Sequence, residues 1–388
     1  MKWERKSIGD VCYVGDGAHA SIKRQPDGFQ YLSSKNFKLD GLDLSKVDFI
    51  SEADYQKHFK DESKAITKPK FNDVLLSIIG SLGAPYLVKQ DDIFGLSSSV
   101  SILRPNNEFI DPNFLYYWIK SNEFQSSINN IKSGVAQSFL SLGMIKSLPV
   151  IFPNELPTQR KIASILSAYD DLIENNLKRI KLLEEQAFLK YKGIVSSEKL
   201  KAVQLKDVAV VNESTLKANS NIDKLLYVDI ASVSTGSIDN KTEYDLKEAP
   251  GRAKRILKHE DIIWSCVRPN RKSYAFVWQP ENNLIASTGF AVITSKAIPS
   301  TFLYQLTTAN EFVSYLENHA KGATYPAVTA TDFAEALINI PADSIMQEYH
   351  DAVSPCYELK SILQKQNTKL REARDILLPK LMNGQIEV

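Results

Sequence analysis

The residues best suited to chemistry in this sequence form a basic cluster between positions 252 and 274. Arginine and lysine neutralise phosphates, and arginine and asparagine can make paired hydrogen bonds with the edges of guanine and adenine. Proline and asparagine in the second half of the cluster indicate a turn from which side chains project. The cluster predicts contact with nucleic acid; the alternative is a solvated loop without a partner. Its members are Arg252, Lys254, Arg255, Lys258, Arg268, Asn270, Arg271, Lys272 and Tyr274.

A thinner group of candidates lies in the first half of the chain. The stretch Gly15 to Ala20 is a flexible loop that precedes two basic residues, and Gly80 to Gly83 would let another backbone approach closely. Side chains after Gly134 could contact a base or cap a helix. For each single residue a structural role is an equal alternative. The candidates are His19, Lys23, Arg24, Lys35, Asn36, Ser81, Gln137 and Ser138.

The sequence carries no recognisable catalytic or metal-binding motif. Its 5 histidines show no pairing with cysteine or with each other at metal-ligand spacing. Residues 236–242 resemble a phosphate-binding loop only faintly, because the second glycine before Lys241 is missing. Neither a GxGxxG nor a GxSxG motif occurs, nor does the Asp/Asn-Pro-Pro-aromatic tetrapeptide of base methyltransferases. We therefore expect a non-enzymatic chain that holds no metal and no cofactor.

Composition indicates an ordinary globular protein with more than one domain. At 388 residues a single core is not expected. Hydrophobic residues make up 43% and charged residues 24%, and the net charge of +1 leaves local clustering as the only electrostatic guide to partners. We find neither a signal-peptide pattern nor an apolar run of about 18 residues. The 3 scattered cysteines suggest reduced thiols, hence a cytoplasmic protein without contact to membranes.

The elements that must position these residues are organised around one long helix, predicted at 156–194. Apolar residues recur in alternating steps of four and three, which is the seam of a helix paired with another helix. At 1.5 Å per residue a helix of about 35 residues spans about 50 Å. Asn176 on the seam either fixes the register of the pair or lies at its rim. The seam positions are Ile162, Leu166, Tyr169, Ile173, Asn176, Ile180, Leu183, Ala187, Lys190 and Ile194.

The partner helix is predicted at 349–381. Pro355 lies inside this stretch, so we expect the helix to kink or to begin there, and Gly384 can cap its end. Both helices are charged on their other faces and need each other to bury their stripes. The second seam consists of Tyr349, Ala352, Cys356, Leu359, Leu363, Gln366, Leu370, Ala373 and Leu377.

The chain repeats itself at a constant offset. FLYYWIKSNEF at 114–124 returns as FLYQLTTANEF at 302–312, and 302 − 114 = 188. FNDVLLSII at 71 returns as HEDIIWSCV at 259, again 259 − 71 = 188. Each copy is a mixed domain followed by a helix. In the first copy we predict strands at 74–79 and 99–103 and a helix at 112–123; in the second, strands at 225–230, 262–267 and 289–293 and a helix at 301–319.

These observations predict an α+β fold with two duplicated domains, joined by two long antiparallel helices and related by an approximate twofold axis. Two similar heads at a fixed distance suit a partner with two similar features at a fixed distance. Duplex DNA is the obvious partner of this kind.

Over nearly its whole length the chain resembles the specificity (S) subunit of type I restriction–modification systems. The resemblance rests on the duplication, the paired helices and an ordered set of motifs. These are GDGAH, YLSSKNF, DVLLSIIGSLG, LSSSVSILRP, LPTQRKIASIL, DIIWSCVRPNRKSYAF, IASTGFAVI, GATYPAV and LREARDILLPKLMNGQIEV. In the GATYPAV motif, Thr324 and Tyr325 join the candidate DNA contacts.

The resemblance implies target recognition domains at 1–155 and 198–343 and conserved helical regions at 156–197 and 344–388. Each recognition domain would read one half of a bipartite, asymmetric site in the major groove of double-stranded DNA. The helices would set the spacer between the halves and dock two modification (methyltransferase) subunits. Restriction (motor-nuclease) subunits would join the larger complex. S-adenosylmethionine, ATP and Mg would belong to those partner subunits.

Two rival functions remain open at this stage. The chain could be a self-contained DNA-modifying enzyme with built-in recognition domains, against which the missing catalytic motifs count. It could also be an adaptor that binds two copies of a protein and no DNA. Charge reversal at Arg268, Arg271 and Lys272 would leave the function of such an adaptor unchanged.

Overall fold

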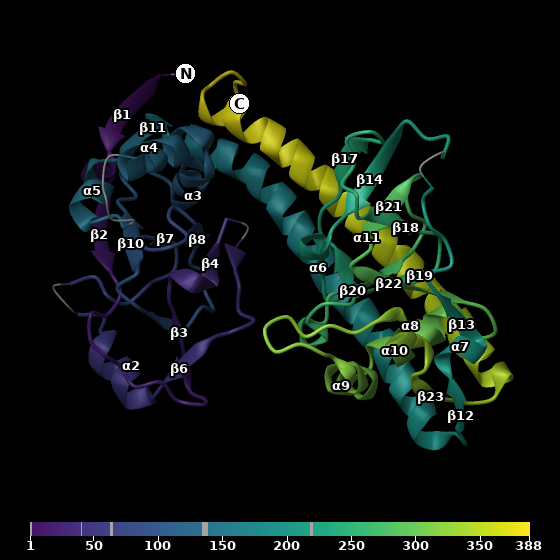
Figure 1. Ribbon diagram of the computed structural model, residues 1–388. Coiled ribbons are helices and arrows are strands. Elements are labelled where there is room, and N and C mark those ends of the chain that lie inside the picture. Colours follow the sequence, from purple (N-terminus) through teal and green to yellow (C-terminus); the bar gives the residue numbers. More distant parts are fainter. Residues whose placement is uncertain (1, 40, 63–64, 134–138, 218–219) are drawn as a thin grey trace. The chain divides into compact units, whose positions relative to one another are not determined.

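The computed structural model describes residues 2–39, 41–62, 65–133, 139–217 and 220–388. The candidates Gln137 and Ser138 lie outside the described residues. The chain forms two compact units, Met1–Glu174 with Thr368–Val388 (unit 1) and Asn175–Asn367 (unit 2). Each unit contains one mixed domain and one part of each long helix, α6 (Leu156–Ser197) and α11 (Asp343–Met382) (Figure 1).

The domain of unit 1 is built on two small sheets. The first has the antiparallel order β2-β10-β7-β8, and the second has the order β6-β3-β9, in which β3 and β9 run parallel. All four residues of β7 are buried, as befits a strand covered on both faces. The elements are β1 (Trp3–Ser7), α1 (Ile8–Val11), β2 (Cys12–Asp16), β3 (Phe29–Leu32), η1 (Ser34–Asn36), β4 (Phe37–Lys38), β5 (Gly41–Leu42), β6 (Asp48–Ile50), α2 (Glu52–His58), β7 (Val74–Ser77), β8 (Pro85–Leu87), β9 (Phe94–Leu96), β10 (Val100–Pro105), α3 (Pro112–Lys120), α4 (Asn122–Ser133), α5 (Leu142–Ser147) and β11 (Pro149–Pro153).

The domain of unit 2 repeats this plan. Its first sheet has the order β13-β22-β19-β20, and its second has the order β17-β14-β21-β18, with β14 and β21 parallel. The central strand β19 is buried throughout. The elements are β12 (Lys201–Gln204), α7 (Leu205–Val208), β13 (Ala209–Val211), β14 (Lys224–Val228), η2 (Ile230–Ser232), β15 (Val233–Ser234), β16 (Ser237–Ile238), β17 (Thr242–Asp245), β18 (Ala253–Ile256), β19 (Asp261–Ser265), η3 (Pro269–Arg271), β20 (Tyr274–Val277), β21 (Leu284–Ser287), β22 (Phe290–Ser295), α8 (Ser300–Thr308), α9 (Asn310–His319), α10 (Ala330–Ala334) and β23 (Leu337–Ile340).

The predicted α+β duplication is confirmed, and the structure shows where its constant offset ends. Helices α3 and α8 are related by 300 − 112 = 188 residues, but β2 and β13 by 209 − 12 = 197. The stretch from β2 to β7 in the first domain is therefore nine residues longer than the stretch from β13 to β19 in the second. The longer stretch includes α2. The candidates His19, Lys23, Arg24, Lys35 and Asn36 lie within this unequal stretch, so they cannot be aligned with the second domain by the offset of 188.

One helix predicted from the sequence is two helices in the structure. The helix expected at 301–319 breaks at Ala309, whose ψ of 152° is extended, and the equivalent helix in the first domain breaks at Ser121, with ψ 153°. The apolar pattern runs across both breaks, which is why the sequence alone suggests a single helix. The indole N–H groups of Trp118 and Trp264 donate to the carbonyls of Pro149 and Thr307 and fix the helices against their domains.

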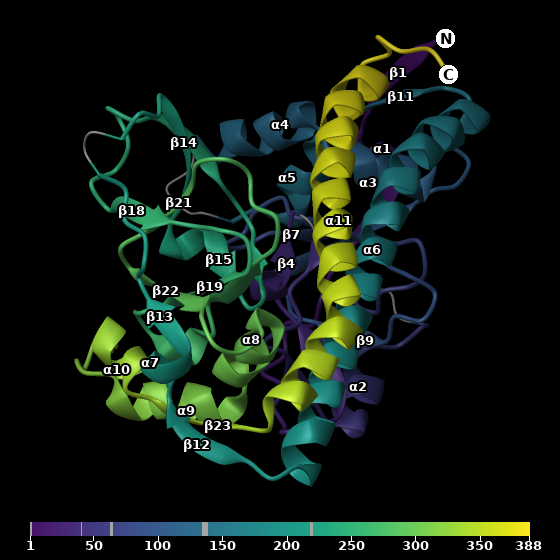
Figure 2. The ribbon, with the colours of Figure 1, turned by 90° about the vertical axis from the view of Figure 1, so that its right-hand side faces the viewer.

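The helix pair is antiparallel in both units, and Figure 2 shows α11 beside α6. Within unit 2, the Tyr349 hydroxyl donates to the Ala187 carbonyl and Asn176 reaches Asn367, so residue numbers rise along α11 as they fall along α6. In unit 1 the Arg374 guanidinium binds Asp170. Helix α6 begins at Leu156 as predicted. Helix α11 begins at Asp343 and continues through Pro355, so of the two alternatives predicted at this proline, a kink or a start, the start is wrong.

Most seam positions are buried or partly buried, and the three exposed ones have one cause. Lys190, Ala352 and Gln366 are exposed, while the next residues, Tyr191, Val353 and Asn367, are buried. A straight helix has 3.6 residues per turn, so its buried face drifts away from a strict heptad. Tyr191 and Val353 also belong to the core of the second domain, which widens the face to be buried. Buried seam residues are Ile162, Leu166, Ile173, Asn176, Ile180, Ala187, Tyr349, Cys356 and Leu363; Tyr169, Leu183, Ile194, Leu359, Leu370, Ala373 and Leu377 are partly buried.

Asn176 lies inside the helix pair and not at its rim, since it is 4% exposed. Its side-chain amide donates to Asn367 Oδ1 at 2.9 Å and to Gln366 Oε1 at 3.1 Å. Asn367 is itself 2% exposed, so its carbonyl oxygen depends on this donor. A buried polar pair of this kind favours one register of the two helices over its neighbours.

We predict that Asn176→Ala lowers the free energy of unfolding by about 1–3 kcal/mol, because the buried Asn367 oxygen loses its donor. Chemical denaturation of the purified chain measures this difference. The control is Asn175→Ala, at the exposed neighbouring position, with an expected change below about 0.5 kcal/mol. Equal effects of both substitutions would show that the polar pair contributes nothing specific.

Candidate nucleic-acid interface

In unit 2 the turn between β19 and β20, residues 268–272, is the basic turn predicted from the sequence. Arg268 and Lys272 both have left-handed backbone conformations, with φ of 52° and 53°. Such a conformation is unfavourable for residues other than glycine. Backbone hydrogen bonds hold it in place: Arg268 N donates to the Pro326 carbonyl at 2.7 Å and Lys272 N to the Pro269 carbonyl at 2.9 Å. Asn270 and Arg271 are exposed at the tip.

A second loop, residues 321–327, lies against the basic turn and is called here the tyrosine loop. Reciprocal backbone hydrogen bonds between Lys321 and Ala327 close it at 2.9 Å each, and Ala327 forms a bridge with Val267. The Arg268 guanidinium lies 4.5 Å from the centre of the Tyr325 ring and donates to the Thr324 carbonyl at 3.3 Å. Tyr325 remains 66% exposed. The fold thus brings Arg268, Thr324 and Tyr325 together on one surface.

The other members of the basic cluster take different positions. Arg252 is exposed just before β18, and Arg255 on β18 is half-buried. Burial raises the pKa of the Cys266 thiol to about 11, and the positive charge of Arg255 opposes this rise. Tyr274 is half-buried, with its ring centre 4.7 Å from that of Trp264; burial raises its pKa to about 12. Tyr274 thus packs against Trp264, and its contact with DNA stays a prediction.

Unit 1 has an equivalent pair of segments. Ile79 forms a bridge with Phe139 as Val267 does with Ala327, and both offsets are 188 (267 − 79 and 327 − 139). Gly80, at the position equivalent to Arg268, also has a positive φ of 73°. Gly80 to Gly83 is therefore the counterpart of the basic turn, with Ser81 exposed upon it. The positive φ of this turn is adopted by glycine in the first domain and by basic residues in the second.

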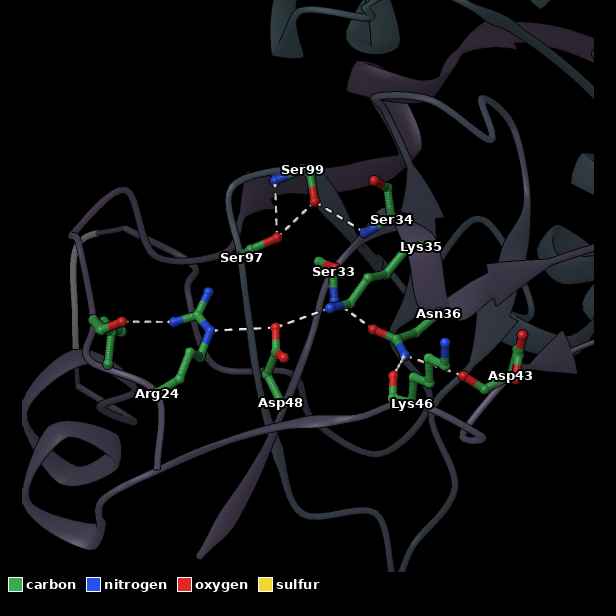
Figure 3. A network of polar contacts seen from close by, with 11 residues as sticks. Arg24, Ser33, Ser34, Lys35, Asn36, Asp43, Lys46, Asp48, Ser97 and Ser99 are labelled. Carbon is green, nitrogen blue, oxygen red and sulfur yellow. Dashed lines mark hydrogen bonds and ion pairs between the residues drawn. The ribbon is translucent and has the colours of Figure 1, made fainter. Parts of the chain in front are cut away.

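Two candidate cations of unit 1, Arg24 and Lys35, bind Asp48 (Figure 3). Lys35 Nζ donates to Asp48 Oδ2 at 3.0 Å, and Arg24 Nε donates to the same oxygen at 3.3 Å. These hydrogen bonds lower the pKa of Asp48, so its carboxylate stays charged. The Arg24 guanidinium also lies 4.1 Å from the Tyr31 ring centre. One carboxylate thus orients two exposed cations, and the trio keeps a net positive charge.

Asn36, next to this trio, is not available to DNA. It is 1% exposed, its Oδ1 accepts from Ser33 N, and its Nδ2 donates to the carbonyls of Asp43 and Lys46 (Figure 3). Asn36 is therefore a structural residue, which corrects its prediction as a DNA contact. Lys23 is exposed, and His19 is exposed with Nε2 2.8 Å from Asp16 Oδ2.

The sequence did not single out Asp48 or Asn310 as parts of these surfaces. Asp48 orients Arg24 and Lys35, and Asn310, at the start of α9, accepts a hydrogen bond from Lys272 Nζ at 3.1 Å. Among the described residues, no three or more His, Cys, Asp and Glu side chains gather in a way that suits a metal ion. No helix of the described segments is long and apolar enough to cross a membrane.

Comparison with known proteins agrees with this architecture. The family model for the type I restriction modification DNA specificity domain matches residues 1–185 and again residues 197–372. The chain belongs to this family. The double match reproduces the two domains that the internal repeat predicts.

One curated relative matches the full length of the chain, and another matches a third of it. The type I restriction enzyme MjaIX specificity subunit of Methanocaldococcus jannaschii is 25% identical over 425 residues, which covers 100% of this chain and 94% of the relative. The HindI specificity subunit of Haemophilus influenzae is 30% identical over 138 residues, 33% of this chain and 30% of the relative. These relatives are named as specificity subunits, in keeping with the expected non-catalytic role.

A solved structure shows the same fold. The crystal structure of the type I restriction–modification S subunit from M. genitalium superposes with a TM-score of 0.59 at 15% sequence identity. The alignment covers 98% of this chain and 96% of that one.

We predict that Lys272→Gly raises the free energy of unfolding by about 0.5–1 kcal/mol. Glycine removes the penalty of the left-handed conformation, which exceeds the added freedom of the unfolded chain. The matched control is Asn270→Gly in the same turn, where φ is not positive; there glycine adds only unfolded-state freedom and lowers stability. Thermal and chemical denaturation measure both. A loss of stability in Lys272→Gly would show that the Lys272–Asn310 contact outweighs the backbone strain.

Proposed function

We propose that this chain is the DNA-recognition subunit of a type I restriction–modification complex. In each unit, the turn after the buried central strand contacts one half of a bipartite DNA site and determines which bases are bound there. The observation that carries the proposal is the pairing of Arg268 with Tyr325 on an exposed surface, at the place where the first domain repeats the same backbone. An oriented guanidinium beside polar and aromatic groups suits a guanine edge in the major groove.

The two surfaces are built from different residues, which supports an asymmetric site. The first domain has Lys23, Arg24 and Lys35 on other segments and glycine at the turn, whereas the second has Arg268 and Asn270 on the turn itself. Different donors select different bases. In this proposal Arg252, Arg255, Arg271 and Lys272 neutralise phosphates, which fixes the protein on the duplex without reading sequence.

The helices α6 and α11 set the spacing of the two half-sites in this proposal and scaffold the catalytic partners. Exposed apolar side chains occur at equivalent positions of the two helices, since Phe188 is 42% and Ile376 59% exposed and 376 − 188 = 188. Equivalent apolar positions suit two copies of one partner, which we take to be two modification subunits. Restriction subunits complete the assembly in the cytoplasm. S-adenosylmethionine, ATP and Mg are supplied on those partners.

The rival functions make different predictions. A self-contained DNA-modifying enzyme would methylate or cut DNA as a purified chain, whereas the recognition subunit acts only with its partners. A twin-domain protein adaptor would keep its function after charge reversal at Arg268, Arg271 and Lys272. The exposed donors on both surfaces favour DNA over a protein partner.

Genome-wide methylation mapping tests the proposal first. In cells that express this chain with its modification subunit, we expect one methylated motif of two short, unequal blocks separated by a fixed gap. The motif should vanish when this chain is deleted and the modification subunit is retained. A motif that persists without the chain, or that consists of a single block, would contradict the proposal.

Salt dependence of DNA binding tests the phosphate and base contacts. For the complex with the modification subunit, Arg271→Ala should weaken binding and reduce the slope of log affinity against log salt by about 0.9 if Arg271 binds one phosphate. The control, Lys201→Ala on the exposed part of β12, should leave affinity and slope unchanged. If Arg271→Ala also leaves both unchanged, the basic turn does not touch DNA.

A further inference from the structure

One buried cation joins the helix pair to the second domain. Lys360 on α11 is 5% exposed, and its Nζ lies 2.5 Å from Glu184 Oε1 on α6 and donates to the Gly236 carbonyl at 2.8 Å. A buried ammonium needs partners of this quality because its removal from water is costly. Lys360, Glu184 and Gly236 all lie within unit 2.

Gly236 is shaped for this contact. It forms the turn between β15 and β16 with a φ of 78°, which favours glycine. A Cβ atom built there would lie 3.1 Å from the Glu184 carboxylate oxygen and 3.8 Å from Lys360 Nζ. A side chain at this position would crowd the Glu184 carboxylate that binds Lys360 and would be strained by the positive φ.

The same hairpin continues to the basic turn by main-chain hydrogen bonds. Gly236 N donates to the Tyr274 carbonyl at 2.8 Å, and Thr235 forms a bridge with Tyr274. Tyr274 N in turn donates to the Lys272 carbonyl at 3.1 Å. Two backbone links therefore separate the residue that binds Lys360 from the last residue of the basic turn.

We propose that Lys360 is a positioning residue for DNA recognition. It holds the β15–β16 hairpin on the helix pair and thereby sets where the basic turn presents Arg268 and Asn270 to the bases. The inference rests on the proposed function and adds a residue of the helical region, outside the recognition surface, to the determinants of specificity. Lys360 does not touch DNA in this account; it acts through Gly236 and Tyr274.

The role can be separated from stability. Replacing a buried ion pair by an apolar side chain of similar size is often neutral for folding. Lys360→Met keeps most of the volume and removes the link to Gly236. The Glu184 carboxylate remains solvated in this variant, because its side chain is already 40% exposed.

The chain offers a matched control one helical turn further on. Lys365, on the same helix, donates from Nζ to the Gln279 carbonyl at 3.1 Å. Gln279 follows β20 at the end opposite to the basic turn. Lys365→Met therefore removes an exposed lysine–carbonyl contact from the same helix without touching the path to the turn.

The experiment measures binding of the complex with the modification subunit to three duplexes. One carries the motif mapped with the unaltered chain, and the others carry a base-pair change in one half-site each. Arg268→Ala identifies the half read by the basic turn. We expect Lys360→Met to lower discrimination in that half by about tenfold, the scale of one base contact, and to leave discrimination in the other half intact. Lys365→Met should match the unaltered chain.

Every outcome of this experiment supports or contradicts the positioning role of Lys360. A uniform loss of affinity for all three duplexes, or discrimination equal to that of Lys365→Met, overturns the positioning role. Should Lys360→Met fail to fold by thermal denaturation, Glu184→Gln replaces it: the neutral amide weakens the hold on Lys360, and a smaller loss in the same half-site is expected. If the complex of the unaltered chain discriminates in neither half, the proposed function fails, which is a different result.

Discussion

The structure depends on the mutual burial of two long helices. Neither α6 nor α11 can leave its apolar stripe in water, and neither is stable alone at such a charge density on its other faces. Each domain then adds its own side chains to the same helices: Tyr191 and Val353 complete the core of the second domain, and Ile162 and Leu166 that of the first. The pairing is therefore part of both cores.

Polar contacts within this interface specify the register of the two helices more than they stabilise the pair. Asn176 with Asn367, Asp170 with Arg374 and Glu184 with Lys360 each tie one point of α6 to one point of α11. A slip of one helix by a turn would leave each of these buried or half-buried groups unpaired. Apolar contacts alone would tolerate such a slip far better, so the polar contacts define the register of the two helices.

Much of the architecture could be predicted because repetition and heptad spacing are long-range signals. The start of α6, the strands β7 and β19 and the double domain follow from them. The breaks at Ser121 and Ala309 could not be predicted, because a helix can end without a change in the apolar pattern. At Pro355 the sequence left a start and a kink open, and the start is excluded because a long helix fixed by tertiary packing tolerates a proline that would end an isolated one. Of the candidate contacts, residue type suggested Asn36, but burial decides its role, and burial arises only from the fold.

The division of the chain into units has a consequence for its synthesis. Unit 1 includes Leu381 and Met382, which share a core with Ile162 and Leu166, although the second domain is made in between. From Glu174 to Met382 the ribosome adds 382 − 174 = 208 residues, which takes roughly 10–40 s at about 5–20 residues per second. For that interval the first domain exists without the helix segment that completes its core. An incomplete first domain is thus an obligatory intermediate on the ribosome, exposed to chaperones and proteases until the chain has been finished.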